Sequence, residues 1–310
     1  MEWLGLDKTE KIWMDGRFVD WDDAKIHVLT HSLHYATAVF EGIRCYETVK
    51  GPAIFRLRDH MRRLYDSAKM QMMKIPYSID ELIQAVKDTV KVNKIHECYI
   101  RPIAYYGYGE MGLNPTRNPV NVAIAVWPWG AYLGEEGLKK GVRCKISSWI
   151  RVDTRSLPPL AKSTANYLNS ALAKLEAINC GYDEAILLNM NGYVAEGPGE
   201  NIFIVKNGVL VTPPVTSCAL YGYTMDSVKE FAKEFSIPII EREIIRDELF
   251  VADEAFFTGT AAEVTPIREV DGRVIGSGTI GPITKMLQDK FFQVVRGEDS
   301  KYKDWLEPVQ

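Results

Sequence analysis

The chain has 310 residues, of which 46% are hydrophobic and 25% charged, the composition of an ordinary globular protein with one large or two medium domains. Its formal net charge of −4 gives no support to binding of nucleic acid or an anionic membrane, and no apolar run approaches the roughly 20 residues of a membrane span. The five cysteines are scattered without a Cys-x-x-Cys pair, and the N-terminal stretch lacks a signal-peptide pattern, so we expect a cytoplasmic protein with reduced thiols.

Turn signals of β-hairpins recur along the chain. An Asp-Gly or Asn-Gly pair stands between strand-like runs at 13–19, 187–194, 203–211 and 269–275. Such pairs favour the positive backbone angles of tight two-residue turns. We therefore predict a hairpin at each of these positions.

Helices are predicted between the hairpins. One candidate covers 58–74, and a second begins at Ser78, where Ser-Ile-Asp-Glu forms a capping box. A third starts just after Lys162 and ends near Gly181; its apolar face carries Leu168, Ala171, Leu172, Leu175 and Ile178. A fourth follows Thr224 as its N-cap, and a fifth lies near Gly281.

Interleaved hairpins and helices indicate an α+β architecture, because a parallel sheet would require strict βαβ repetition. The segment WPWGAYLGEEG follows the strand-like run VNVAIAV and interrupts the pattern with proline and glycine. We predict a smaller N-terminal domain at 1–128, an interdomain loop at 129–137 and a larger C-terminal domain at 138–310.

Lys162 is the first candidate for chemistry. It lies in LAKSTANYLNS, after an apolar, proline-containing run and before a helix. A lysine attacks a carbonyl only when its amine is partly neutral, which shielding and a helix N-terminus both favour. An ordinary exposed lysine in a first helical turn fits the same local residues, so these alone leave both interpretations open.

Two glutamates lie in the turn GYVAEGPGENIF at 192–203. Gly-Pro-Gly separates Glu196 from Glu200, so the turn holds both acids near the backbone. A fixed carboxylate beside a ring nitrogen would keep that nitrogen protonated, because opposite charge favours the charged form. A solvated turn is the alternative.

Three stretches could bind an anion. TGTAAE at 258–263 follows a strand-like run, LYGYTMDS at 220–227 opens a helix, and Arg58 begins another helix. Each alone also fits an ordinary turn or a surface arginine. His27, His31 and His34 have spacings that suit metal ligands, but no carboxylate or cysteine completes the set, so no metal site is predicted.

Seven segments occur in an order typical of one family: FEGIRCYE, FRLRDHMRRL, YIRP, WPWGAYLG, LAKSTANYLNS, GYVAEGPGENIF and FFTGTAAEVTPIREVDG. Across nearly its whole length the chain resembles the class IV aminotransferases, fold type IV pyridoxal-phosphate enzymes, and most closely those for branched-chain amino acids. The resemblance implies a small α/β domain, a larger domain with a pseudo-barrel, and pyridoxal 5'-phosphate as cofactor. It also implies transfer of the amino group of leucine, isoleucine or valine to 2-oxoglutarate, giving glutamate, by a homodimer, with a hexamer left open.

The resemblance implies a role for each matching residue. Lys162 would bind the cofactor covalently and move a proton, Glu196 would pair with the pyridine nitrogen, and Tyr167 would contact the phenolic oxygen. The implied phosphate ligands are Arg58, the backbone amides of Tyr223 and Thr224, and Thr260. Glu200 and Asn201 would support the turn that carries Glu196.

The implied substrate residues are equally specific. Arg101 would bind the distal carboxylate of glutamate or 2-oxoglutarate, while Tyr99 and the amides of Thr260 and Ala261 receive the α-carboxylate. The apolar walls implied are Tyr35, Phe40, Trp129 and Tyr132. Leu113 would reach into the site of a neighbouring subunit.

The chain departs from the family pattern in three places. Gly222-Tyr223-Thr224-Met225 stands where Gly-Ile-Thr-Arg is usual, Thr164-Ala165 where glycine is common, and Ala36 where glycine is common beside Tyr35. We expect these to affect substrate range. A D-amino-acid transaminase, an aminodeoxychorismate lyase and a non-catalytic cofactor-binding relative are the alternatives on the same scaffold.

Overall fold

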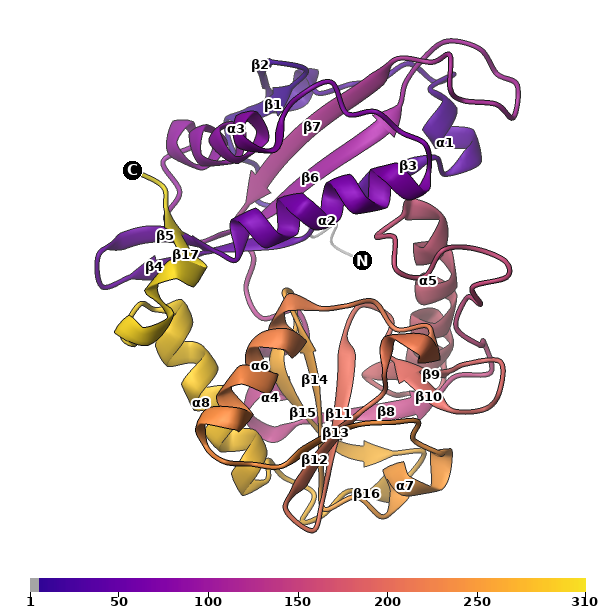
Figure 1. Ribbon diagram of the computed structural model, residues 1–310, viewed down its shortest axis with the longest axis vertical. Coiled ribbons are helices and arrows are strands. Elements are labelled where there is room, and N and C mark those ends of the chain that lie inside the picture. Colours follow the sequence, from indigo (N-terminus) through magenta and orange to yellow (C-terminus); the bar gives the residue numbers. More distant parts are fainter. Residues whose placement is uncertain (1–5) are drawn as a thin grey trace. The chain divides into compact units, whose positions relative to one another are not determined.

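The structure is a computed structural model that describes residues 6–310 (Figure 1). The chain divides into two compact units, each described here by itself. Unit 1 extends to Trp129 and also contains Ala161–Ala165 and Val294–Gln310, whereas unit 2 contains Gly130–Leu160 and Asn166–Gln293. The division after Trp129 falls at the start of the expected interdomain loop, but two segments assigned to the C-terminal domain group with unit 1.

Unit 1 is built on an eight-stranded sheet, counted over the described residues, with the order β17-β5-β4-β6-β7-β1-β2 and with β3 paired to β6. Its strands are β1 (Lys11–Met14), β2 (Arg17–Asp20), β3 (Ala38–Phe40), β4 (Ile43–Thr48), β5 (Gly51–Phe55), β6 (Cys98–Tyr106), β7 (Val120–Trp127) and β17 (Leu306–Pro308). Its helices are α1 (His31–Tyr35), α2 (Leu57–Met70) and α3 (Ile79–Val92).

The core of unit 1 lies between this sheet and two helices. Figure 1 shows α2 and α3 lying across β6 and β7, and α3 contacts β7 while α2 contacts β3. The helices contribute Leu57, Met61, Leu64, Leu82 and Val86 to this core, and β6 and β7 contribute Ile100, Ala104, Val122, Ile124 and Val126. The predicted capping box is confirmed, because the Ser78 hydroxyl accepts from the Glu81 amide and the Glu81 carboxylate accepts from Ser78.

Unit 2 is built on a nine-stranded sheet with the order β10-β9-β8-β15-β14-β11-β12-β13 and with β16 paired to β15. Its strands are β8 (Val142–Ile146), β9 (Glu184–Leu188), β10 (Val194–Glu196), β11 (Asn201–Lys206), β12 (Val209–Thr212), β13 (Ile239–Glu241), β14 (Glu254–Gly259), β15 (Glu263–Val270) and β16 (Arg273–Val274). Strand β8 pairs in parallel with β9 and β15, and β12 pairs in parallel with β13; the other pairings are antiparallel.

The helices of unit 2 are α4 (Gly134–Lys140), α5 (Thr164–Asn179), α6 (Tyr223–Glu234), α7 (Arg246–Phe250) and α8 (Pro282–Val295), although α5 begins and α8 ends within unit 1. Short 3-10 helices elsewhere in the chain cover Trp21–Asp23, Val215–Ser217 and Ser300–Trp305. Helices and mainly antiparallel sheets together confirm the α+β class. In the described part of the chain, no helix is both long and apolar enough to cross a membrane.

The four predicted hairpins are confirmed. They join β1 to β2, β9 to β10, β11 to β12, and β15 to β16. Asn207 and Gly208, between β11 and β12, have φ values of +52° and +75°. An asparagine and a glycine tolerate these left-handed angles, which is why the dipeptide predicts the turn.

Helix α5 buries the face opposite its large apolar residues. Leu168, Leu175 and Ile178 are more than half exposed. Ala173 and Ala177 are buried instead, in a cluster with Ala185 and Leu187 of β9. Small side chains let the helix approach the sheet closely, so unit 2 leaves an apolar stripe of α5 uncovered.

Candidate active site

Lys162 is held in unit 1 by contacts on both sides of its backbone. Its amide donates to the Ser67 hydroxyl of α2 over 2.9 Å, and its carbonyl accepts from the Phe40 amide over 3.0 Å. The Lys162 amine lies 5.3 Å from the centre of the Phe40 ring. This placement two residues before α5 favours a held amine over an ordinary surface lysine.

The predicted substrate residues of β6 share one face of the first sheet. Tyr99 lies opposite Arg44 of β4 and opposite Trp127 of β7, and directly opposed residues project to the same face. Arg101 follows Tyr99 by two positions and therefore also lies on that face. Phe40 pairs with the β6 residue two positions beyond Arg101, so it projects there as well.

Aromatic rings surround the Arg101 guanidinium. Its central carbon lies 4.8 Å from the ring centre of Phe40, 5.4 Å from Tyr99 and 5.8 Å from Trp127. Among the described residues, its buried Nε has no hydrogen-bond partner. The ring of Trp129 meets Tyr99 edge-on with centres 4.5 Å apart. A cation in apolar surroundings, with a donor unsatisfied, suits a carboxylate ligand.

A buried ionic cluster lies beside Lys162. Glu41 on the loop after β3 accepts from Arg63 Nε at 2.7 Å and Nη2 at 2.8 Å, and lies 2.7 Å from His60 Nδ1. Burial opposes ionisation of Glu41, but Arg63 and His60 outweigh it and hold its pKa well below the usual range. Burial, with the positive charges of Arg63 and Lys162, lowers the pKa of His60 despite Glu41.

The assignment of Arg58 as a phosphate ligand needs correction. The Arg58 side chain is about half exposed, and its Nη1 lies 2.9 Å from Asp80 of α3. Arg63 is instead the buried arginine of α2, and its charge acts on His60 together with that of Lys162. Helical spacing in the sequence could have indicated that Arg63 is the buried arginine, because His60 and Arg63 fall at i and i+3 on the face that carries the core residues of α2.

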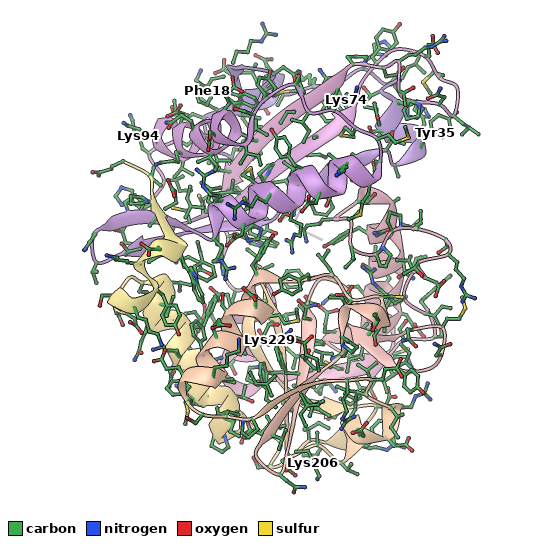
Figure 2. All side chains as sticks on the ribbon, in the orientation of Figure 1. Phe18, Tyr35, Lys74, Lys94, Lys206 and Lys229 are labelled. Carbon is green, nitrogen blue, oxygen red and sulfur yellow. The ribbon has the colours of Figure 1, made fainter. Side chains whose placement is uncertain are left out.

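Two predicted substrate residues of unit 1 lie at its surface. Tyr35 is 40% exposed, and its hydroxyl donates to the Met111 carbonyl; Figure 2 shows it at the α1 end of the unit. Leu113 is 82% exposed. Neither belongs to the aromatic surroundings of Arg101 given above.

Two departures from the family pattern contact each other. Ala36 ends α1 with a φ of +53°, a left-handed conformation that glycine adopts more easily. The Thr164 hydroxyl donates to the Ala36 carbonyl over 2.8 Å, and Thr164 is the first residue of α5. A threonine at this position can therefore hold the strained turn next to Tyr35, which a glycine could not.

In unit 2, three groups bind the Glu196 carboxylate. Arg151 Nε lies 2.7 Å from Oε1, and both side chains are almost fully buried. The Leu220 amide and the Asn201 side-chain amide donate to Oε2 over 3.0 and 3.3 Å. A buried cation and two donors stabilise the ionised acid, the form that would pair with a protonated ring nitrogen.

Asn201 connects the Glu196 turn with the start of α6. Its Nδ2 also donates to the Leu220 carbonyl over 2.7 Å, and a Cβ added to Gly222 would lie 2.0 Å from its Oδ1. The neighbouring Glu200 is buried and accepts from the Gly199 amide. Burial, with the Glu184 charge, raises the pKa of Glu200 to about 8, so this acid is neutral at pH 7.

In unit 2, the start of α6 and the end of β14 form the candidate anion cradle. Gly222 is the N-cap and Tyr223 the first helical residue, so the prediction that Thr224 caps this helix is wrong. Strand β14 contacts α6, and its buried Thr258 hydroxyl has no hydrogen-bond partner among the described residues. Thr260 and Ala261 form the turn after β14. Unpaired N–H groups at a helix start suit a phosphate.

The other predicted residues of unit 2 lie on α5 and on the loop before α4. Tyr167 is half-buried in the first turn of α5. The Tyr132 ring lies 5.3 Å from the Lys174 amine, and both line a cavity of about 780 Å³. The structure thus places Tyr132 against α5 of its own unit. Each unit by itself has groups that pyridoxal phosphate requires: unit 1 has the Lys162 amine, and unit 2 has the Glu196 carboxylate and the start of α6. The residues of each unit therefore fit the cofactor.

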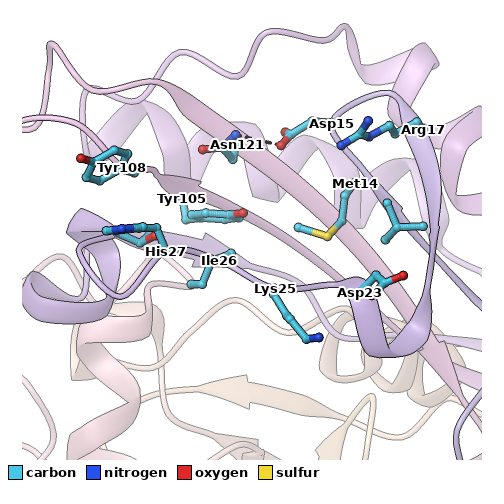
Figure 3. A pocket seen from close by; sticks show the side chains of 12 residues that line it. Met14, Asp15, Arg17, Asp23, Lys25, Ile26, His27, Tyr105, Tyr108 and Asn121 are labelled. Atoms are coloured by element: carbon cyan, nitrogen blue, oxygen red, sulfur yellow. Dashed lines mark hydrogen bonds between the residues drawn. The ribbon is translucent and has the colours of Figure 1, made fainter.

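A separate cavity of about 270 Å³ opens beside the β1–β2 hairpin of unit 1 (Figure 3). Asp15, Lys25, His27 and Tyr105 are among its lining residues, and none of the predicted catalytic, cofactor or substrate residues lines it. His31 is engaged elsewhere, because its ring nitrogens lie 2.8 Å from the Thr37 hydroxyl and the Gly112 carbonyl.

Comparison with known proteins identifies the family of the chain. A family model described as amino-transferase class IV matches residues 38–270. The chain is 49% identical over 303 residues to a branched-chain-amino-acid aminotransferase of Salmonella typhimurium, covering 97% of this chain and 98% of the relative. It is 51% identical over 299 residues to that of Pseudomonas aeruginosa, covering 96% and 97%.

Solved structures give the same result for the fold. The branched-chain amino acid aminotransferase of Escherichia coli superposes with a TM-score of 0.96 at 48% identity, covering 98% of this chain and all of that chain. The enzyme of Thermobaculum terrenum in its PLP form gives a TM-score of 0.91 at 39% identity, covering 97% and 99%. This chain therefore belongs to the class IV aminotransferase family.

Proposed function

We propose that this chain is a pyridoxal-phosphate-dependent transaminase that moves the amino group of leucine, isoleucine or valine to 2-oxoglutarate in a ping-pong order. The observation that carries the proposal is the Arg101 guanidinium, which lies among Phe40, Tyr99 and Trp127 with an unsatisfied donor. The names of the curated relatives support the same donor class.

Each residue group has a defined task in this reaction. When bound, the cofactor supplies an electron-withdrawing ring that stabilises negative charge at the substrate α-carbon. Lys162 would hold the cofactor through its amine and would move the proton at the α-carbon. Glu196, paired with Arg151, would accept a hydrogen bond from the pyridine nitrogen and keep that nitrogen protonated. Tyr167 would contact the phenolic oxygen of the cofactor.

The phosphate ligands differ from those expected from the sequence by one arginine. We assign the charged contact to Arg63, because Arg58 is exposed and already paired with Asp80. The backbone amides of Tyr223 and Thr224 and the Thr260 side chain complete the set. Helix α6 favours the anion through its dipole.

One pocket serves two substrates of different polarity. Leucine, isoleucine and valine bury apolar surface against Phe40 and Trp129, while the distal carboxylate of glutamate turns to Arg101. The α-carboxylate common to all of them binds Tyr99 and the amides of Thr260 and Ala261. Tyr35 and Tyr132 are assigned to the pocket walls by the family resemblance alone.

We further propose a homodimer in the cytoplasm, with Leu113 reaching the neighbouring subunit. Leu113 is 82% exposed, and Val28 and Leu33 near α1 are 66% and 60% exposed. Large apolar side chains exposed to this extent suit an interaction surface. All five cysteines are free thiols, as a reducing compartment requires.

A donor screen of the purified enzyme tests the function. With 2-oxoglutarate as acceptor, L-leucine should be consumed and glutamate formed, whereas D-alanine should be inert. Activity on D-alanine instead would indicate a D-amino-acid transaminase, and release of pyruvate from aminodeoxychorismate without an acceptor would indicate a lyase. Lys162→Ala should abolish both turnover and the cofactor absorbance near 400–430 nm, a range typical of lysine-bound pyridoxal phosphate; retained turnover would remove Lys162 from its role.

A further inference from the structure

Trp127 is a buried residue of the substrate face that sequence patterns did not single out. It is 8% exposed, lies at the end of β7 opposite Tyr99, and its ring centre is 5.8 Å from the Arg101 guanidinium carbon. Among the described residues its indole Nε1 has no hydrogen-bond partner. A buried indole nitrogen normally finds an acceptor, so this one requires an explanation.

The same face carries a second unsatisfied donor. The Nε of Arg101 is buried and unpartnered in the described part of the chain, like the Nε1 of Trp127. Both groups can only donate, so the ligand that satisfies them must present acceptors. Because one of the donors is a guanidinium, the acceptor that best matches the pair is an anion with two oxygens, which is a carboxylate.

We infer that Trp127 is a specificity-determining residue: its indole N–H donates to the distal carboxylate of the dicarboxylic substrate that Arg101 also binds. The inference rests on the proposed function and deepens it. A branched aliphatic side chain offers the indole only ring contact, so the N–H contributes to binding of glutamate and 2-oxoglutarate but not of leucine. The ring and the N–H of one tryptophan thus serve different substrates.

The test is to remove the N–H and keep an aromatic ring. Trp127→Phe and the unmodified cofactor-loaded enzyme are titrated with glutarate, which has a distal carboxylate, and with 4-methylpentanoate, which has none, while the cofactor absorbance is followed. We expect glutarate to bind at least about tenfold more weakly to the variant, or about 1.4 kcal/mol. The dissociation constant of 4-methylpentanoate should change less than about threefold.

Half-reactions give the same contrast in catalysis. With L-glutamate the variant should show a half-saturation concentration raised at least about tenfold, and with L-leucine one changed by less than about threefold. A matched control is Trp13→Phe, since Trp13 is 7% exposed on β1 of the same sheet and contacts Tyr77 edge-on. This control should leave binding of both carboxylates unchanged.

A double-mutant cycle checks that both donors act on one carboxylate. In an Arg101→Leu background, Trp127→Phe should weaken glutarate much less than it does alone, because the carboxylate is no longer held at the indole. If Trp127→Phe does not fold, Trp127→His is used, which retains a ring N–H and should preserve the preference for glutarate.

The inference is overturned if Trp127→Phe leaves glutarate binding unchanged or weakens both ligands equally. Equal weakening of both ligands by Trp127→His overturns it in the same way. Failure of the proposed function is a distinct result, because the unmodified enzyme would then fail to transfer the amino group of L-leucine to 2-oxoglutarate.

Discussion

Replacing Glu41 by glutamine should destabilise unit 1 strongly. Glu41 is fully buried, and three short contacts of 2.7, 2.7 and 2.8 Å join its carboxylate to Arg63 and His60. The amide keeps the shape but removes the charge, so Arg63 stays buried without its counter-ion. Breaking a buried ion pair from one side costs about 3–5 kcal/mol, and full burial means that solvent does not reduce this figure.

Glu47 offers a matched control in the same unit. Its carboxylate also lies 2.7 Å from a histidine, His96, but the two side chains are 49% and 67% exposed. Exposed pairs contribute at most about 1 kcal/mol, so Glu47→Gln should cost little. Urea unfolding followed by tryptophan fluorescence measures both variants. The signal reports mainly on unit 1, because within unit 2 the only tryptophan is Trp149.

The pH dependence gives a second test of the same pair. The pKa of Glu41 is held well below its usual range in the fold, so the stabilisation is complete above the unfolded pKa, about 4.3, and is lost as pH falls through the folded value. The difference in unfolding free energy between the unmodified protein and Glu41→Gln should be constant from about pH 6 to 8 and shrink below about pH 4. Equal costs for Glu41→Gln and Glu47→Gln, or a difference that grows in acid, would refute the reasoning.

Three further predictions concern the proposed cofactor ligands and the residues next to them. Arg63→Ala should raise the dissociation constant of pyridoxal phosphate at least about tenfold through loss of a charged contact, whereas Arg58→Ala, whose partner is the exposed Asp80, should change it less than about twofold; the reverse order in equilibrium dialysis would restore Arg58. Gly222→Ala should also weaken cofactor retention, because the new Cβ would lie 2.0 Å from Asn201 Oδ1 and displace the side chain that contacts Glu196; unchanged dialysis kinetics would count against this link. Glu200→Gln should fold normally at pH 7, where Glu200 is already neutral. With a folded pKa of about 8, the unmodified protein should lose stability relative to this variant as pH rises from about 4.3 to about 8, and parallel stability curves would contradict the assignment.

Features set by neighbouring residues along the chain were predictable. The Asn-Gly pair between β11 and β12 requires left-handed angles that those residues tolerate, and the capping box at Ser78 is closed by a residue three positions away. The ordered motifs also predicted the family and its α+β fold, and they made Lys162 and Glu196 candidates for the active site. In each case the information lies within a few residues or in a motif of fixed spacing, so no tertiary contact is needed to find it.

Contacts between distant segments decided which side chains are buried and which partners they have. Helical spacing places Arg63 on the buried face of α2, but only the fold shows that its partner is Glu41 and that the partner of Arg58 is Asp80. Burial of the alanine face of α5 depends on how closely β9 approaches it.

Strand register decided which side chains share the substrate face of the first sheet. Trp127 joins Tyr99 and Arg101 only because β7 pairs with β6 at one alignment, and a shift of one residue would turn its ring to the opposite face. Local residues determined the hairpin turns and the capping box at Ser78. The tertiary structure determined which of its charged and aromatic side chains are buried together, because burial depends on partners that the local sequence does not specify.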